Sequence, residues 1–215
     1  MSDPHHQIKL SRSEKRFAKG LLKYEIDDCK MIVDVGCGSG WLGEALKEYL
    51  SDPTIIAIDI RPQSQRFNVH FAMMDVRCLG LPSESFDLII AKDTLEHLSC
   101  PILAMEEFAR MLKKNGKLII TVPLPQAPFL WDDYTHVRPF TKVSLSRLLE
   151  DSGFEIVSMK YLAISTIAGG AFLRIDGFLN SLANLGFRRG NILAVGRKKP
   201  ESTNAFNNSR SALQY

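Results

Sequence analysis

Three acidic residues that follow apolar runs are the side chains best placed for chemistry in this chain. Asp34 lies inside MIVDVGCGSG, Asp59 lies near the end of TIIAIDI, and Asp75 follows NVHFAMM. A carboxylate accepts hydrogen bonds from two neighbouring hydroxyls and also binds an ammonium group, which an apolar side chain cannot do. Asp93 follows a fourth apolar run. If these runs are parallel strands, all four acids reach the edge of the sheet where ligands bind.

Glycines at alternate positions, Gly36, Gly38 and Gly40, follow the first run. Glycine permits positive φ and lets a ligand approach the backbone. Dinucleotide-binding turns have a third glycine where this chain has Trp41, and Asp34 would repel a phosphate at short range. The pattern therefore favours a cofactor without phosphate over the alternative, an NAD-dependent dehydrogenase.

Two histidines are candidates for a general base, because an imidazole can be neutral near pH 7. His136 lies in PLPQAPFLWDDYTHVRPF, a loop rich in proline and aromatic residues that follows the fifth apolar run. His97 lies in LEHL. Each also has a structural interpretation, in which His136 hydrogen-bonds its loop and His97 bonds the start of the next helix. We expect Trp131, Tyr134 and Arg138 of the same loop to shape a pocket for the substrate.

Composition limits the other classes of function. The formal net charge of +3 is too small for a dedicated nucleic-acid binder. We predict no metal site, because no group of histidines has metal-ligand spacing along the sequence. The cysteines, which form no C-x-x-C pair, are expected to be reduced thiols, and the polar N-terminus lacks the apolar core of a signal peptide. These features predict a cytoplasmic protein.

Alternating apolar runs and helical patterns predict parallel strands joined by right-handed crossovers. A helix is expected over 11–24, with Ser11 as its N-cap, as a lid over the site or packed at the sheet edge. A helix over 101–114 should be closed by Asn115 and Gly116. Further helices are expected after Gly40 and over 145–153, and strands over 31–35, 54–60, 68–74, 86–91, 117–122, 155–163 and 191–196.

The length of 215 residues and 45% hydrophobic content predict a single domain over 1–197, followed by a flexible tail at 198–215. An insertion at about 165–189 separates the last two strands and has an apolar stripe at helical spacing. Its charges and length exclude a transmembrane span. Three roles remain open for it: a substrate lid, a homodimer contact, or a peripheral contact with a membrane.

Several of these stretches together resemble the class I S-adenosylmethionine (SAM)-dependent methyltransferases, specifically the small-molecule branch, type 11, that includes ubiquinone and menaquinone methyltransferases. The stretches are VDVGCGSG, the acids of IAIDI and MMDV, and the succession FDLII, LEHL and LKKNGKLIITVP. The resemblance covers about residues 30–159. It implies an α/β fold with a Rossmann-like, seven-stranded, mostly parallel sheet, an antiparallel last strand, and helices on both faces.

The resemblance also implies the cofactor SAM and the residues that hold it. Asp34 and the turn of Gly36, Gly38 and Gly40 would hold the methionine part. Asp59, with Ile60 beside it, would bind the ribose. Asp75 would bind the adenine amino group, and Val76 would contact the adenine ring. Lys92 would line the site chiefly through its backbone. The implied function is methyl transfer to a small-molecule acceptor, which could be lipid-like or a glycan; the alternative is a related module without catalysis that serves binding or assembly.

Overall fold

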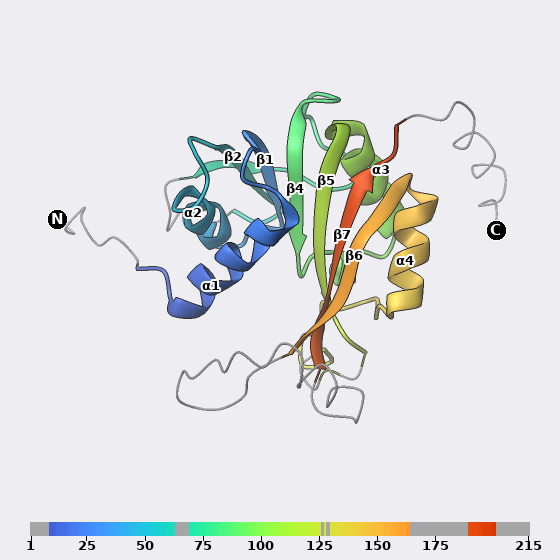
Figure 1. Ribbon diagram of the computed structural model, residues 1–215. Coiled ribbons are helices and arrows are strands. Elements are labelled where there is room, and N and C mark those ends of the chain that lie inside the picture. Colours follow the sequence, from blue (N-terminus) through green and yellow to red (C-terminus); the bar gives the residue numbers. More distant parts are fainter. Residues whose placement is uncertain (1–8, 63–68, 126, 128–129, 164–188, 201–215) are drawn as a thin grey trace.

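The computed structural model describes residues 9–62, 69–125, 127, 130–163 and 189–200, and it contains one seven-stranded sheet in the order β3-β2-β1-β4-β5-β7-β6 (Figure 1). The elements in chain order are α1 (Arg12–Leu21), the 3-10 turn η1 (Leu22–Tyr24), β1 (Met31–Val35), α2 (Trp41–Lys47), β2 (Thr54–Asp59), β3 (His70–Met73), β4 (Phe86–Lys92), the 3-10 turn η2 (Leu95–His97), α3 (Pro101–Met111), β5 (Leu112–Pro123), α4 (Lys142–Asp151), β6 (Phe154–Ala163) and β7 (Arg189–Lys198).

The strand directions confirm the predicted fold. Strand β1 pairs in parallel with β2 and β4, β2 with β3, and β4 with β5. Strand β7 is antiparallel to both of its neighbours, β5 and β6. The carboxyl ends of the parallel strands therefore meet at one edge of the sheet. This is the edge where the four acids were expected from the sequence.

Two apolar layers cover the faces of the sheet, because neighbouring residues of a strand point to opposite faces. Ile32 packs in a core cluster that contains Ala18 of α1 and Leu46 of α2. Its neighbour Val33 packs in the other cluster, with Phe108 of α3 and Leu145 of α4. Figure 1 shows α1 and α2 together on one side of the sheet and α3 and α4 together on the other. The predicted placement of helices on both faces is confirmed.

Helix α1 begins at the predicted N-cap. Ser11 accepts a hydrogen bond from the Glu14 backbone N–H, and Glu14 reaches back to the Ser11 N–H at 2.7 Å, a capping box. The helix packs on the sheet face through Ala18. At the same time the Phe17 ring lies edge-on to the Trp41 ring, with centroids 5.9 Å apart. Helix α1 thus combines packing on the sheet with a contact to the glycine turn.

The predicted end of the helix over 101–114 is wrong. Helix α3 ends at Met111, and β5 begins at once with Leu112. The pairing with β4 jumps from Phe86–Leu112 to Leu88–Lys117, so the intervening residues form an irregular bulge inside the strand. Asn115, with φ of 63°, takes up a left-handed conformation in that bulge. Because a left-handed residue serves a helix C-cap and a bulge alike, the sequence alone did not separate the two.

The C-terminal boundary also differs from the expectation. Strand β7 continues through Lys198, which is buried and whose Nζ donates to the Leu112 carbonyl at 2.8 Å. The predicted insertion at 165–189 lies outside the described residues except for Arg189, where β7 begins, and so do residues 201–215 of the predicted tail. No helix in the described part of the chain is long and apolar enough to cross a bilayer.

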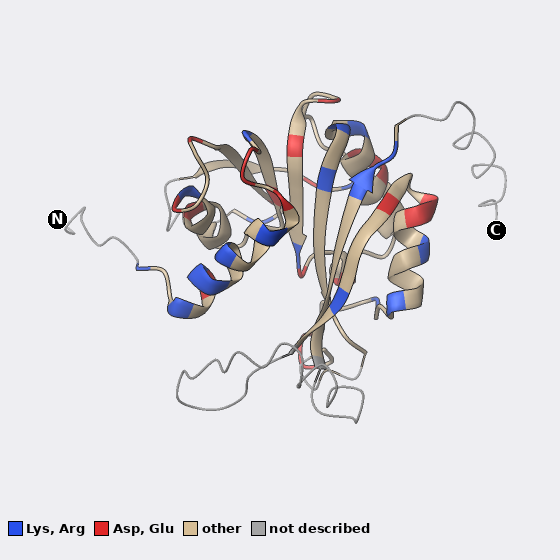
Figure 2. Ribbon diagram, viewed as in Figure 1, with Lys and Arg blue, Asp and Glu red and all other residues tan. Residues whose placement is uncertain are grey.

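Charged residues lie mainly on the helices and near strand ends, and most of the length of the strands is uncharged (Figure 2). One half-buried acid at the amino end of the sheet, Asp87, has a structural role. Asp87 accepts hydrogen bonds from the backbone N–H groups of Lys30 and Met31 at 3.0 and 2.9 Å, and from Lys113 Nζ at 2.7 Å. It therefore joins β4 to the starts of β1 and β5.

We predict that Asp87→Asn lowers the free energy of unfolding at pH 7 by about 1–3 kcal/mol, because the lost hydrogen bonds end on a charged group. Burial alone would raise the pKa of Asp87, but the bonds from Lys113, Met31 and Lys30 outweigh it and hold the pKa below its ordinary value. The stabilisation is thus present above the unfolded-state pKa and is lost as pH falls through the folded pKa. Urea unfolding at pH 7 and at pH 3 measures the difference, which should shrink at pH 3. Asp27→Asn, an exposed acid before β1, is the control and should change little.

Candidate functional site

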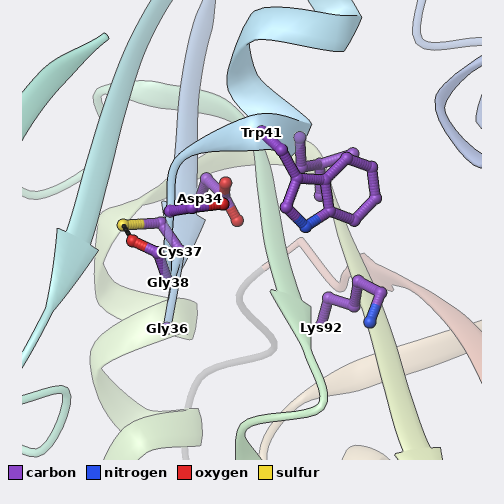
Figure 3. A pocket seen from close by; sticks show the side chains of 8 residues that line it. Asp34, Gly36, Cys37, Gly38, Trp41 and Lys92 are labelled. Carbon is purple, nitrogen blue, oxygen red and sulfur yellow. Dashed lines mark hydrogen bonds between the residues drawn. The ribbon is translucent and has the colours of Figure 1, made fainter. Parts of the chain in front are cut away.

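A cavity of about 180 Å³ lies at the carboxyl ends of β1 and β4. Its lining comes from β1, the glycine turn, the start of α2 and the end of β4: Asp34, Gly36, Cys37, Gly38, Ser39, Trp41, Leu42 and Lys92. Figure 3 shows Asp34 and the turn on one side, and the Trp41 ring and the Lys92 side chain on the other. The cavity is thus built at the place where the sequence predicted a cofactor.

Asp34 is a buried carboxyl group with an unused hydrogen-bonding atom. The residue is 2% exposed, and its Oδ2 has no hydrogen-bond partner among the described residues. Burial raises the pKa of Asp34 to about 7 and the nearby Asp59 adds to that rise, whereas the nearby Lys92 and a backbone hydrogen bond from Gly43 oppose it. A buried carboxylate oxygen without a partner is costly unless a ligand supplies a hydrogen-bond donor or a positive charge. Asp34 is therefore prepared for a cationic donor at the cavity wall.

The glycine turn has the backbone conformations that the sequence predicted. Gly36, Gly38 and Gly40 have φ values of 68°, 52° and 79°. A Cβ at Gly36 would lie 2.3 Å from Thr94 Oγ1, so the turn touches the loop after β4. A Cβ at Gly38 would meet nothing within 4 Å. The space over Gly38 is therefore open to a ligand, whereas Gly36 is required by close packing.

The other predicted acids are already engaged in hydrogen bonds. Asp59 accepts from the Gly38 and Arg61 backbone N–H groups, each at 3.0 Å, and so supports the turn. Asp75 pairs with Arg77 at 2.5 Å, and these bonds lower the pKa of Asp75. Hydrogen bonding with a charged partner holds such an acid ionised. Of Asp34, Asp59 and Asp75, Asp34 is the one that has a carboxylate oxygen without a hydrogen-bond partner among the described residues.

Asp93 ties together the ends of three strands. Its carboxylate accepts from Thr121 Oγ1 of β5 at 2.7 Å and from Asn191 Nδ2 of β7 at 2.6 Å, and it pairs with Lys92. Lys92 Nζ also lies 6.0 Å from the centre of the Trp41 ring. The Lys92 side chain, and not its backbone alone, therefore lines the cavity in this structure.

The two candidate histidines, 39 residues apart in the sequence, lie side by side. The ring centroids of His97 and His136 are 4.6 Å apart. Ligand atoms of Glu96, His97 and His136 all lie within 4.8 Å of one another. The loop is attached to η2 by the backbone, since the N–H groups of Val137 and Arg138 both donate to the Glu96 carbonyl, at 2.9 and 3.1 Å.

Glu96 is the buried member of this group. It is 1% exposed, and neither carboxylate oxygen has a hydrogen-bond partner within the described residues. Burial, and then the negative charge of Asp93, raise the pKa of Glu96 to about 8. Burial and the neighbouring His136 lower the pKa of His97. The group therefore combines a desolvated acid with an imidazole that is neutral at pH 7.

The three residues expected to shape the acceptor pocket lie outside the cavity lining. Trp131 and Tyr134 are 61% and 94% exposed, and Arg138 donates to the Ser99 carbonyl at 3.0 Å. Their loop is described except for residues 126, 128 and 129. A role for them in acceptor binding stays a prediction.

Comparison with known proteins identifies the family. Residues 8–159 match the model of a family described as "Methyltransferase domain". The chain belongs to this methyltransferase family. The alternative left open by the sequence, an NAD-dependent dehydrogenase, belongs to a different family from the one that matches. This methyltransferase chain also resembles curated proteins: it is 29% identical over 100 residues to a ubiquinone biosynthesis O-methyltransferase of Coxiella burnetii, covering 43% of each chain.

A second curated relative of this methyltransferase chain is a malonyl-[acyl-carrier protein] O-methyltransferase of Hahella chejuensis, 28% identical over 136 residues, which cover 59% of the chain and 49% of the relative. The matches thus span less than half the length of these two relatives. Among solved structures, a SAM-dependent methyltransferase from Archaeoglobus fulgidus has a TM-score of 0.66 at 19% identity, with 86% and 94% of the two chains covered.

A 1,6-didemethyltoxoflavin-N1-methyltransferase of Burkholderia thailandensis, solved with bound 1,6-didemethyltoxoflavin and S-adenosylhomocysteine, has a TM-score of 0.65 at 17% identity, with 88% and 80% of the chains covered. At these identities the two structures show a shared fold. Together with the family match they confirm the family and the fold that the resemblance implied.

Sequence reasoning missed two residues of this region of the methyltransferase chain. Thr94 fills the space against Gly36, and its hydroxyl donates to the Val35 carbonyl at 3.0 Å. From the sequence, no role was assigned to Glu96 of LEHL. The signal that indicates a role is an acid next to a histidine, with a leucine on each side of the pair. The histidine group was missed because its members are distant in sequence.

We predict that Gly36→Ala lowers the free energy of unfolding by about 1–3 kcal/mol, since a side chain at positive φ is strained and must also displace Thr94. Chemical denaturation measures the change. Gly20→Ala is the matched control: it makes the same substitution in α1, where a Cβ meets nothing within 4 Å, and should be neutral or up to about 1 kcal/mol stabilising. Equal effects of the two substitutions would contradict the packing argument.

Proposed function

We propose that this chain is a SAM-dependent methyltransferase that acts on a small-molecule acceptor. The observation that carries the proposal is the buried Oδ2 of Asp34, which has no hydrogen-bond partner among the described residues and belongs to the wall of the glycine-turn cavity. SAM carries an ammonium group that such an oxygen can accept from, and no phosphate that Asp34 would repel. When bound, SAM supplies a methyl group on a sulfonium sulfur that an acceptor lone pair can displace.

The residues around the cavity fit each part of this cofactor. Gly36, Gly38 and Gly40 offer backbone at the methionine end, and the open space over Gly38 permits close approach. Asp59 would receive the ribose hydroxyls on the lone pairs that its two backbone bonds leave.

The residues proposed for adenine lie beyond Asp59. Ile60 is 62% exposed, an apolar surface that a flat ring could cover. Asp75 would accept from the adenine amino group, and Val76, which is buried next to it, would border the ring. These roles follow from the family resemblance, and the exposed Ile60 is the feature of this structure that supports them.

We further propose an oxygen atom as the methyl acceptor. The two curated relatives described above are both named as O-methyltransferases, although one acts in ubiquinone biosynthesis and the other on malonyl-[acyl-carrier protein]. A hydroxyl acceptor must lose a proton, and we assign the role of base to His136 or His97. His136 Nδ1 bonds the Leu130 carbonyl at 2.5 Å, which leaves Nε2 for that role.

The first experiment supplies the protein with radiolabelled SAM and a metabolite extract. Transfer of label to a small molecule supports catalysis. Binding of SAM without transfer to any fraction supports the alternative of a binding or assembly module. In parallel, SAM or S-adenosylhomocysteine should raise the melting temperature and NAD should not. A rise with NAD alone would overturn the assignment of the cofactor.

Asp59→Ala should weaken SAM binding roughly tenfold or more, because it removes an acceptor for the ribose and the support of Gly38. Isothermal titration calorimetry measures the affinity. Asp27→Ala, which changes an exposed acid, provides the comparison and should bind normally. An affinity of Asp59→Ala equal to that of wild type would remove Asp59 from the site.

The binding of SAM should also depend on pH through Asp34. With a pKa of about 7, the free protein holds Asp34 mostly neutral at pH 6 and increasingly ionised toward pH 8. Because an ammonium needs the ionised form, affinity should rise by up to roughly tenfold per pH unit from pH 6 to 7.5, before the amino group itself deprotonates. Asp34→Asn should bind weakly and with a flat profile over this range.

The same pKa predicts the stability of the protein without ligand. The folded pKa of Asp34 lies above the unfolded value, so the folded state holds the proton more tightly between about pH 4 and 7. The contribution of this group to stability is therefore lost as pH rises through that window. Thermal melts should show Asp34→Asn gaining stability relative to wild type from pH 4 to 7. A loss instead would mean that the empty site stabilises the ionised form of Asp34 more than burial disfavours it.

A cytoplasmic location and a small-molecule acceptor, lipid-like or a glycan, remain proposals. Cys29, Cys37, Cys78 and Cys100 are free thiols in the described structure, which is the state expected in a reducing compartment. The proposed homodimer and peripheral membrane contacts rest on the insertion, outside the described residues, and the absence of a nucleic-acid partner rests on the small net charge.

A further inference from the structure

Glu96, His97 and His136 form a side-chain group that binding of SAM does not use. We propose that these three residues bind one divalent transition-metal ion beside the cofactor cavity. They lie at the carboxyl end of β4, where η2 follows Lys92 of the cavity wall, and the loop that carries His136 is attached to η2. Only the role of the ion in methyl transfer rests on the proposed function.

The first argument is the state of Glu96. A carboxyl group that is 1% exposed with both oxygens unpartnered in the described structure lacks the hydrogen bonds that buried acids normally have. Among the described residues, Lys92 and Arg138 do not supply them, since Lys92 pairs with Asp93 and Arg138 donates to the Ser99 carbonyl. A cation bound between Glu96 and the two imidazoles would give the carboxylate its missing partner.

The second argument is the orientation of the imidazoles. His97 Nδ1 lies 2.9 Å from Thr135 Oγ1 and 3.3 Å from the Thr135 carbonyl. The Thr135 hydroxyl hydrogen is used toward Asp133 Oδ1 at 2.6 Å, so Thr135 accepts and His97 Nδ1 carries the hydrogen. His136 Nδ1 likewise faces a carbonyl, that of Leu130. Metal-binding histidines usually donate their second N–H in this way, which leaves Nε2 for the ion.

The ligand atoms of Glu96, His97 and His136 must move slightly closer together to share one ion. Their ligand atoms lie within 4.8 Å of one another. Ligands that each lie about 2.0–2.2 Å from one ion are themselves roughly 3–4 Å apart. A shift of the exposed His97 side chain together with Thr135, to which its Nδ1 is bonded, would close this gap. Asp133, whose Oδ2 is 3.9 Å from His136 Nε2, adds negative charge beside the group.

The chemistry of the ligands selects the class of ion. Two imidazoles and one carboxylate suit Mn²⁺, Fe²⁺, Co²⁺, Ni²⁺ or Zn²⁺, whereas Mg²⁺ and Ca²⁺ prefer ligands that are all oxygen. Three protein ligands leave coordination positions open. An acceptor hydroxyl bound there would have a lowered pKa and would release its proton to solvent water, so the ion would replace an imidazole as the means of activating the oxygen.

The test measures metal binding itself, by calorimetric titration of the full chain, without an affinity tag, with MnCl₂, ZnCl₂ and MgCl₂. His5 and His6 are adjacent in the sequence and are replaced by Gln in every sample, so that they do not bind added metal. We expect about one Mn²⁺ or Zn²⁺ per chain and much weaker binding of Mg²⁺. Glu96→Gln, His97→Gln and His136→Gln should each weaken binding at least roughly tenfold. His70→Gln, at the exposed start of β3, is the matched control and should bind as the parent does.

Absence of Mn²⁺ and Zn²⁺ binding, or equal binding by the parent and by His97→Gln, would overturn the proposal. His97 is exposed, so this variant should fold even if a variant of the buried Glu96 does not. The SAM-induced change in melting temperature is recorded on the same samples. If the chain binds SAM but no metal, the proposed metal site is wrong and the proposed cofactor still stands. If the chain binds metal but not SAM, the proposed cofactor is wrong and the metal site still stands.

Discussion

The site depends on close contact between the tip of β1 and the loop that follows β4. Gly36 packs against Thr94, and the Thr94 hydroxyl bonds the Val35 carbonyl at 3.0 Å. Because a side chain at position 36 would occupy the place of Thr94, this contact requires glycine. It fixes the turn that forms the cofactor cavity and, two residues after Thr94, the position of Glu96. The cavity and the histidine group are therefore two sides of one packing arrangement.

The acids at this edge divide into structural and available groups. Asp93 joins β4 to β5 and β7, Asp59 supports the glycine turn, and Asp75 is paired with Arg77. Asp34 and Glu96 keep unpartnered oxygens in the described structure. Burying such groups lowers the stability of the empty protein. Functional sites commonly accept this cost, since the same groups gain their partners when ligands bind.

Strong local patterns made much of the fold predictable. The β-branched run before the glycines, the Ser11 cap, and the alternation of strands and helices each specify one structure, and they agree with one another. The end of α3 was predicted wrongly because Asn115 can adopt a left-handed conformation in a helix cap and in a bulge alike. That choice is made by the pairing of β5 with β4, which is a long-range contact. Lys198 was likewise assigned to the tail, because its hydrogen-bond partner, the Leu112 carbonyl, lies 86 positions away in the sequence.

By itself, the sequence determined the family, the order of the strands that carry Asp34 and Asp59, and the need for glycine in the turn, because these follow from local spacing and backbone sterics. The tertiary structure decided which groups keep free atoms. Within the described residues it showed Asp34 with one unpartnered oxygen and Asp59 with both oxygens engaged, although both end apolar runs. It also brought His136 beside His97, 39 positions earlier in the chain, and beside Glu96. The physical reason is that desolvation and hydrogen-bond partners depend on which segments pack together, and that information is not contained in the spacing of residues along the chain.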